Sequence, residues 1–146
     1  MNKIVLRDGF VYKKEGIVKA DLLISEGKLF LQFSKMDEEG ATVYDVDGKL
    51  IVPGFVDVHV HLREPGFSYK ETIKSGCRAA AHCCYTAVCA MPNLNPPPSN
   101  IEYLTLEMAK IHEAACIAVY PHGRLTKTQS GIGELSDIAE MAPYVI

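Results

Sequence analysis

The sequence predicts an α/β fold with a parallel sheet, preceded by a small β-rich segment. Strand-like runs begin near residues 55, 85 and 116, and this spacing of about 30 residues is the length of one strand–helix–strand unit. Helix signals lie between the runs: Ser68-Tyr69-Lys70-Glu71 matches a capping box, and apolar residues recur every three or four positions from 101 to 115. Such units form parallel sheets with right-handed crossovers. A doubly wound open sheet and a (β/α)₈ barrel both fit this pattern.

The residues after the strands bear on this choice. A dinucleotide-binding sheet carries Gly-x-Gly-x-x-Gly after a strand, and this chain has no such sequence. A complete barrel needs about 250 residues, so a chain of 146 residues holds only the first three βα units. A third, shorter helix is expected at 134–142, and residues 144–146 are expected to open a fourth strand.

Residues 1–53 are predicted to be the N-terminal part of a small β-domain, a segment of a β-sandwich. Asp8-Gly9, Glu26-Gly27 and Asp47-Gly48 each lie between apolar or alternating runs. Such pairs supply the positive φ of two-residue hairpin turns, so the unit is predicted to be antiparallel. The acidic loop at 37–40 is expected to be solvated. The character changes at Pro53-Gly54, and residues 54–146 are predicted to be the N-terminal part of the metal-dependent barrel.

Composition narrows the class of protein. Hydrophobic residues make up 48%, and the net charge of −3 argues against a nucleic-acid partner. No apolar run approaches the roughly 20 residues of a membrane helix, and the N-terminus lacks a signal-peptide core. The five cysteines are odd in number and lack paired CxxC spacing, which favours free thiols in a reducing compartment. We expect a cytoplasmic protein.

Polar side chains alternate with apolar ones along the first parallel strand. Because side chains alternate along a strand, the polar set shares one face, with two imidazoles about 7 Å apart. Both can then reach one metal ion or two adjacent ions, and the arginine beyond them suits a carboxylate. Barrel active sites lie at the C-terminal ends of strands, which favours a metal site over a pair of hydrogen-bonded histidines. The polar residues are Asp57, His59, His61 and Arg63; the apolar ones are Val56, Val58, Val60 and Leu62.

Two stretches resemble the amidohydrolase superfamily and, within it, the dihydroorotases. Asp57-Val58-His59-Val60-His61-Leu62-Arg63-Glu64-Pro65-Gly66 is similar to the family's first barrel strand and following loop. Ala87-Val88-Cys89-Ala90-Met91-Pro92-Asn93-Leu94-Asn95-Pro96 is similar to its second strand and substrate loop. Leu50-Ile51-Val52-Pro53-Gly54-Phe55 resembles the end of the small β-domain before the barrel. Allantoinases tend to have Asn where Arg63 stands, and hydantoinases lack the Arg-Glu-Pro-Gly sequence.

The resemblance implies an amidohydrolase (β/α)₈ barrel with two Zn²⁺ per complete site. It implies reversible conversion of N-carbamoyl-L-aspartate and (S)-dihydroorotate in de novo pyrimidine (UMP) biosynthesis. By motif position, His59 and His61 would bind metal, and Arg63 and Asn93 would hold the substrate carboxylate. The remaining metal ligands and the catalytic aspartate are expected beyond Ile146, so no catalytic residue is assigned in this chain. The 146-residue chain alone is therefore expected to be inactive.

Two alternatives to this enzyme remain open. One is a non-catalytic, dihydroorotase-like scaffold that binds aspartate transcarbamoylase, although such relatives usually lose the metal histidines. The other is a cyclic-amide hydrolase of the allantoinase or hydantoinase type. A homodimer also stays open, whereas no membrane or nucleic-acid partner is expected.

Some positions depart from the family or carry weaker signals. Cys83-Cys84 occupies a helix-to-strand turn where the family generally has Gly-Gly. The residue after a helix often adopts the left-handed conformation, which costs a residue with a Cβ about 1 kcal/mol or more. A strained or different turn is therefore expected. His122 follows the third strand but is not expected to be a ligand, and Arg124 is expected to be solvated.

Overall fold

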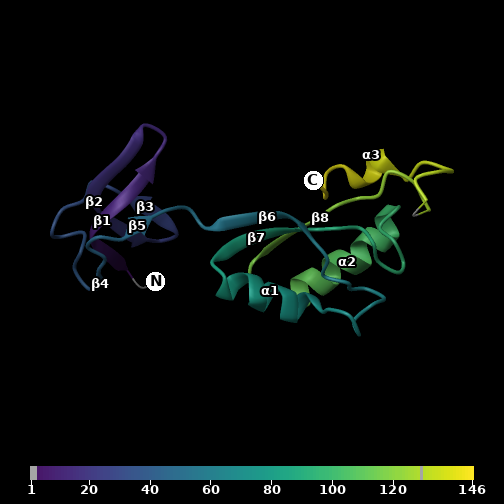
Figure 1. Ribbon diagram of the computed structural model, residues 1–146, viewed down its shortest axis with the longest axis horizontal. Coiled ribbons are helices and arrows are strands. Elements are labelled where there is room, and N and C mark those ends of the chain that lie inside the picture. Colours follow the sequence, from purple (N-terminus) through teal and green to yellow (C-terminus); the bar gives the residue numbers. More distant parts are fainter. Residues whose placement is uncertain (1–2, 129) are drawn as a thin grey trace. The chain divides into compact units, whose positions relative to one another are not determined.

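The computed structural model describes residues 3–128 and 130–146 and divides into two compact units, Met1–Pro53 and Gly54–Ile146 (Figure 1). The first unit contains a five-stranded sheet. The second contains a three-stranded sheet and the helices α1, α2 and α3. In the part of the chain that is described, no helix is long and apolar enough to cross a bilayer.

The first unit is a mixed sheet built around its first strand. β1 pairs antiparallel with β2 and parallel with both β4 and β5, while β3 pairs antiparallel with β2. The prediction of an antiparallel unit is therefore wrong for β4 and β5. Residues 3–53 form one sheet, and the prediction that this sheet is a segment of a β-sandwich stays a prediction. The strands are β1 (Ile4–Lys13), β2 (Gly16–Ser25), β3 (Lys28–Phe30), β4 (Thr42–Asp45) and β5 (Leu50–Ile51).

The predicted turn at Asp8-Gly9 is instead an irregularity inside β1. Asp8 has a φ of 62°, and the register with β2 shifts between Leu6 and Gly9. The Asp21 carboxylate accepts the Asp8 N–H at 2.8 Å, which keeps the displaced residue on the sheet. That hydrogen bond also lowers the pKa of Asp21. Glu26-Gly27 does form the predicted turn, between β2 and β3, with positive φ at both residues.

Part of the acidic loop at 37–40 makes contacts with the sheet. Arg7 on β1 forms ion pairs with Asp21 at 2.6 Å and with Glu38 at 2.8 Å. Hydrogen bonds to these carboxylates raise the pKa of Arg7. Asp37 accepts from the Ser34 backbone N–H at 2.7 Å. The expectation that this loop is only solvated is wrong, because Glu38 ties it to β1.

The second unit has the predicted parallel strands, in the order β6-β7-β8. The central strand β7 is almost wholly buried from Ala87 to Ala90, as expected for a strand covered on both faces. Helix α1 follows β6 and α2 follows β7, so each parallel step contains a helix. The elements are β6 (Phe55–Val60), α1 (Ile73–His82), β7 (Tyr85–Ala90), α2 (Ile101–Ala114), β8 (Ala118–Pro121) and α3 (Ile138–Met141).

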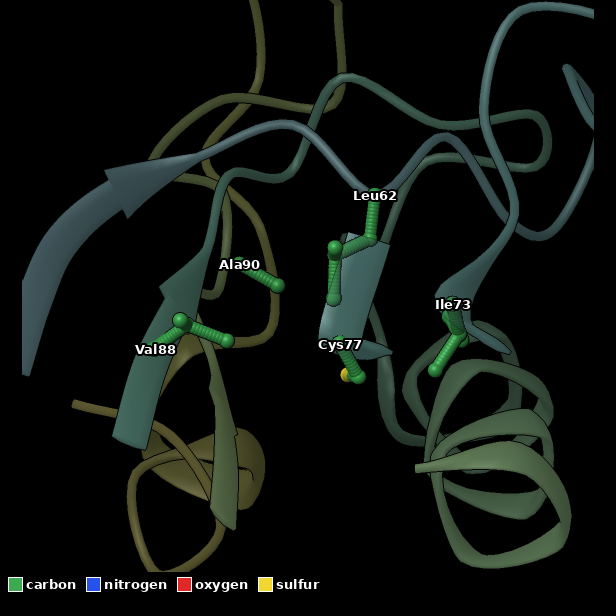
Figure 2. Packing of buried hydrophobic residues seen from close by; sticks show 5 residues of the cluster. All are labelled: Leu62, Ile73, Cys77, Val88 and Ala90. Atoms are coloured by element: carbon green, nitrogen blue, oxygen red, sulfur yellow. The ribbon is translucent and has the colours of Figure 1, made fainter. Parts of the chain in front are cut away.

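A buried apolar cluster joins α1 to the central strand (Figure 2). Its members are Leu62, Ile73, Cys77, Val88 and Ala90. Burial also raises the pKa of the Cys77 thiol. The predicted apolar face of β6 is only partly covered: Leu62 belongs to the cluster, whereas Val56 and Val58 are 56% and 68% exposed. This packing fixes the chain just after β6, where Leu62 enters the cluster.

Helix α2 begins as predicted, whereas α1 begins later than predicted. Asn100 caps α2 by accepting the Tyr103 N–H at 2.9 Å. The cap of α1 is Thr72, whose hydroxyl accepts the Ser75 N–H at 3.0 Å, so the capping box proposed at 68–71 is wrong. Glu64 explains the later start, because its carboxylate accepts the Ile73 N–H at 2.8 Å.

The C-terminal elements are shorter than predicted. Of the helix expected at 134–142, only Ile138–Met141 is helical, because a bridge between Thr126 and Leu135 holds the preceding residues in a closed loop. Residues 144–146 form no strand, although the Ile146 N–H donates to the Pro121 carbonyl at 3.3 Å. The loop is also closed by an ion pair at 3.0 Å between Lys127 and Glu134.

The turn between α1 and β7 has the left-handed residue that the sequence implied. Cys84 has a φ of 66°, while Cys83 has a φ of −95°. Replacing Cys84 with glycine is expected to stabilise the protein by about 1 kcal/mol, because glycine adopts this conformation without strain. Replacing Cys83 with glycine is the control and is expected to destabilise by about 0.5–1 kcal/mol. Urea unfolding checks both; equal effects would contradict the explanation.

Candidate functional site

The three parallel strands deliver their following residues to one edge of the sheet. Val60 pairs with Ala90, and Ala90 pairs with Pro121. Two further hydrogen bonds extend the alignment past the strand ends, from Met91 N–H to the Val60 carbonyl at 2.8 Å and from His122 N–H to the Ala90 carbonyl at 2.9 Å. The loops after β6, β7 and β8 therefore start side by side.

His59, on β6, and His61, just after this strand, lie together. The rings of His59 and His61 have centroids 5.1 Å apart in an edge-to-face arrangement. The Nδ1 atom of His61 is 2.8 Å from the Oδ1 atom of Asn93. Because this amide oxygen can only accept, His61 carries its proton on Nδ1 and its Nε2 lone pair stays available. A histidine held in this tautomer can bind a metal ion through Nε2.

The Asp57 side chain forms a hydrogen bond with the backbone of its own strand. Its carboxylate accepts the His59 backbone N–H at 3.0 Å. No hydrogen bond among the described residues joins the Asp57 carboxylate to an imidazole ring. The contact instead constrains the local backbone of β6 at the position of the first histidine.

The loop after β6 is shaped by close contact with the loop after β7. Arg63 has a φ of 65°, and its carbonyl accepts the Phe67 N–H at 2.9 Å. Gly66 has a φ of 100°, and a Cβ there would overlap Asn95. The Asn95 N–H donates to the Pro65 carbonyl at 3.1 Å. The Arg-Glu-Pro-Gly sequence thus lets the two loops touch, and Glu64 anchors them to the start of α1.

The predicted site residues line one cavity of about 520 Å³. It includes His59, His61, Arg63 and Asn93, which come from the two motifs that the sequence singled out. It also includes Arg124, a half-buried residue that was expected only to be solvated. His122 is not among the lining residues; its ring nitrogens each lie 3.3 Å from a backbone carbonyl. The complete lining is His59, His61, Arg63, Phe67, Lys70, Met91, Pro92, Asn93 and Arg124.

The cavity is cationic and lacks acidic side chains. Arg63, Lys70 and Arg124 line it, and no Asp or Glu of the described residues does. The Lys70 ammonium lies 5.5 Å from the centre of the Phe67 ring and 5.6 Å from that of Tyr69, which places its charge against aromatic faces. A cavity of this kind suits an anionic ligand. Among residues 3–128 and 130–146, no group of three or more His, Cys, Asp or Glu is arranged to hold a metal ion.

Solved structures with a similar fold are named hydantoinases or dihydropyrimidinases. The L-hydantoinase (dihydropyrimidinase) from Arthrobacter aurescens matches with a TM-score of 0.78 at 22% identity, covering 86% of this chain and 28% of that one. A D-hydantoinase matches with a TM-score of 0.70 at 25% identity, covering 88% of this chain and 29% of that one. The chain thus has an amidohydrolase fold.

Sequence comparison identifies the family within this fold. A family model described as dihydro-orotase-like matches residues 48–144. The dihydroorotase of Lactobacillus leichmannii is 44% identical over 143 residues, which are 97% of this chain and 34% of that protein. The dihydroorotase of Bacillus cytotoxicus is 45% identical over 134 residues, which are 91% of this chain and 31% of that protein. The chain belongs to the dihydro-orotase-like family, and it spans about a third of the length of these relatives.

Proposed function

We propose that the protein containing this chain is a zinc-dependent dihydroorotase, which interconverts N-carbamoyl-L-aspartate and (S)-dihydroorotate in pyrimidine biosynthesis. The observation that carries the proposal is the convergence of His59, His61, Arg63 and Asn93 on one cavity. Family membership and relatives named dihydroorotase at 44% and 45% identity support it. In this assignment residues 54–146 supply the first three βα units of a (β/α)₈ barrel, and 1–53 supply part of the small β-domain.

The two histidines fit a metal site. They lie 5.1 Å apart between ring centroids, and the hydrogen bond from His61 to Asn93 leaves the His61 Nε2 atom available. Bound zinc supplies a Lewis acid that polarises an amide carbonyl. His59 and His61 would hold this metal together with ligands from outside the described residues, because catalytic zinc takes at least three protein ligands. The 146-residue chain alone is therefore expected to be inactive.

Arg63 and Asn93 would hold the substrate carboxylate. The guanidinium offers a planar pair of N–H donors to a carboxylate, and the Asn93 amide offers N–H donors while its oxygen serves His61. The aromatic and apolar lining at Phe67, Met91 and Pro92 would exclude water from one side of the ring. These residues bind and orient the substrate, and the chemical step depends on groups outside the described residues.

The test of the proposal is a substrate panel with the product of the full reading frame, loaded with zinc. Hydrolysis of dihydroorotate in clear preference to hydantoin, dihydrouracil and allantoin is the expected result. Preference for one of the other rings would replace dihydroorotase by another cyclic-amide hydrolase. A folded, zinc-loaded protein that hydrolyses none of them, and binds aspartate transcarbamoylase, would favour the scaffold alternative.

Replacing Arg63 with methionine is expected to raise KM for dihydroorotate by about a hundredfold, because a charge-assisted bidentate pair is worth about 1.5–3 kcal/mol. Zinc content is expected to stay unchanged, since Arg63 is not a ligand. Steady-state kinetics and metal analysis of the same preparation check this. A variant that loses zinc would contradict the assignment of Arg63 to the substrate.

Replacing Asn93 with leucine tests its two contacts separately. Loss of the acceptor for the His61 Nδ1–H is expected to weaken zinc binding about 10- to 100-fold, as for other groups that orient a metal-binding histidine. The R63M variant is the matched comparison, since it removes only a substrate contact. If N93L raises KM without weakening zinc binding, the role of Asn93 in orienting His61 is wrong.

A further inference from the structure

The third parallel strand brings a cation to the cavity that the sequence motifs do not assign. From the aligned positions Val60, Ala90 and Pro121, a count of three residues along each chain segment reaches Arg63, Asn93 and Arg124. All three line the same cavity. Arg124 therefore occupies, after β8, the position equivalent to that of Arg63 after β6 and of Asn93 after β7.

The backbone of Arg124 is held in place by the neighbouring loop. Its N–H donates to the carbonyl of Pro98 at 3.1 Å, and Pro98 is itself fully buried just before α2. The Arg124 residue is half-buried, and its guanidinium forms no ion pair or hydrogen bond with the rest of the described chain. A partly desolvated guanidinium without a protein carboxylate is available to an anionic ligand.

The positive charge that the described residues bring to the cavity exceeds what one carboxylate requires. Arg63 is a partner for the carboxylate that both dihydroorotate and N-carbamoyl-aspartate carry. Lys70 and Arg124 add two further positive charges, and no Asp or Glu among the described residues lines the cavity. The open-chain acid has a second carboxylate, which disappears as a charge when the ring closes. A surplus cation therefore interacts more strongly with the open-chain acid than with the ring.

We propose that Arg124 is a specificity-determining residue that favours the doubly charged open-chain acid over the singly charged cyclic amide. The proposal rests on the proposed function, because it takes both ligands from that reaction. Removing one positive charge should weaken binding of a dianion by about the square of the factor for a monoanion, since Coulomb energy scales with ligand charge. Arg124 thus sets the relative affinity for the two ligands and takes no part in the chemical step.

Dissociation constants are the appropriate measure. The equilibrium constant of the reaction fixes the ratio of kcat/KM in the two directions, so no substitution can change that ratio. We would titrate the zinc-stripped product of the full reading frame with N-carbamoyl-L-aspartate and with dihydroorotate, using calorimetry. Without zinc the ligands do not interconvert during the titration.

R124Q is expected to weaken binding of N-carbamoyl-L-aspartate about tenfold and of dihydroorotate about threefold, the ratio expected from the two ligand charges. R124K keeps the charge and is expected to keep both constants within about threefold of wild type. K110Q is the matched control, since Lys110 is an exposed residue of α2 outside the cavity and the change in net charge is the same. K110Q is expected to change neither constant.

Equal weakening of both ligands by R124Q, no weakening, or the same effect from K110Q would overturn the proposal. So would a wild-type protein that binds neither acid. If R124Q does not fold, R124M is titrated in its place, with the same tenfold and threefold weakening expected from the loss of one charge. Turnover by the zinc-loaded wild type is measured separately; its absence would refute the proposed reaction, whereas turnover with unchanged binding balance would refute only the role of Arg124.

Discussion

Replacing His61 with alanine in the product of the full reading frame is expected to lower dihydroorotate hydrolysis about a thousandfold or more, together with the zinc content. His61 lies beside His59, with ring centroids 5.1 Å apart, and its tautomer is set by Asn93. Loss of one ligand from a site of three or four leaves a metal that binds weakly and stabilises the transition state poorly. Metal analysis and kcat on the same preparation measure both effects.

The control for this experiment is a histidine on the same unit that lies away from the cavity. His112 is exposed on α2, and H112A is expected to keep wild-type zinc content and turnover. An H61A variant that retains zinc and hydrolyses dihydroorotate within about threefold of wild type would contradict the metal assignment. The same result with H59A would remove the remaining support for it.

Stability of the protein is expected to fall as pH rises from about 4.5 to about 8 because of Glu107. This residue lies on α2 and is 1% exposed, and burial raises its pKa from 4.5 to about 8. Its Oε2 atom has no hydrogen-bond partner in the described part of the chain. Between these pH values the folded carboxyl keeps a proton that the unfolded chain releases. The loss of stability over this window is up to about 5 kcal/mol.

Replacing Glu107 with glutamine is expected to remove this dependence. E107Q and wild type should differ little near pH 4, where both side chains are neutral, and E107Q should be the more stable near pH 8 by up to about 5 kcal/mol. Urea unfolding at several pH values measures the difference. E102Q is the control, since Glu102 is exposed in the first turn of the same helix and should change stability by less than about 0.5 kcal/mol. A constant difference between E107Q and wild type at all pH values would contradict the account.

The parallel part of the fold was predictable from the sequence because its signals are local. The run at 85–91 is apolar and short, and Asn100 precedes a helix with regular apolar spacing, so β7 and α2 follow directly. The start of α1 was not predictable in this way. Thr72 replaces Ser68 as its cap because Glu64, eight residues before Thr72, accepts the Ile73 N–H, a contact that depends on the folded loop.

The N-terminal sheet shows the same limit of local signals. Asp8-Gly9 has the composition of a turn but lies inside β1, because the Asp21 carboxylate on the neighbouring strand accepts the Asp8 N–H. The parallel pairing of β4 and β5 with β1 joins segments far apart in sequence. Turn composition alone does not contain that information, which is why an antiparallel sheet was predicted.

For the site, the motif residues were predictable and their additional partners were not. Alternation along the predicted strand placed His59 and His61 on one face, and the rings do lie together. Arg124 carries no motif, and its place in the cavity follows only from the register of β8 with β7. Counting residues past each strand in the predicted parallel sheet would have found it. The buried Glu107 gave no signal, since a carboxylate on a helix is usually exposed.

The measurement that tests the central claim most directly is turnover of dihydroorotate by the zinc-loaded product of the full reading frame, in the directions of ring opening and ring closure. The account predicts hydrolysis to N-carbamoyl-L-aspartate, the reverse reaction with the same enzyme, and loss of both on removal of zinc. A folded protein with its full zinc content that catalyses neither direction would contradict it.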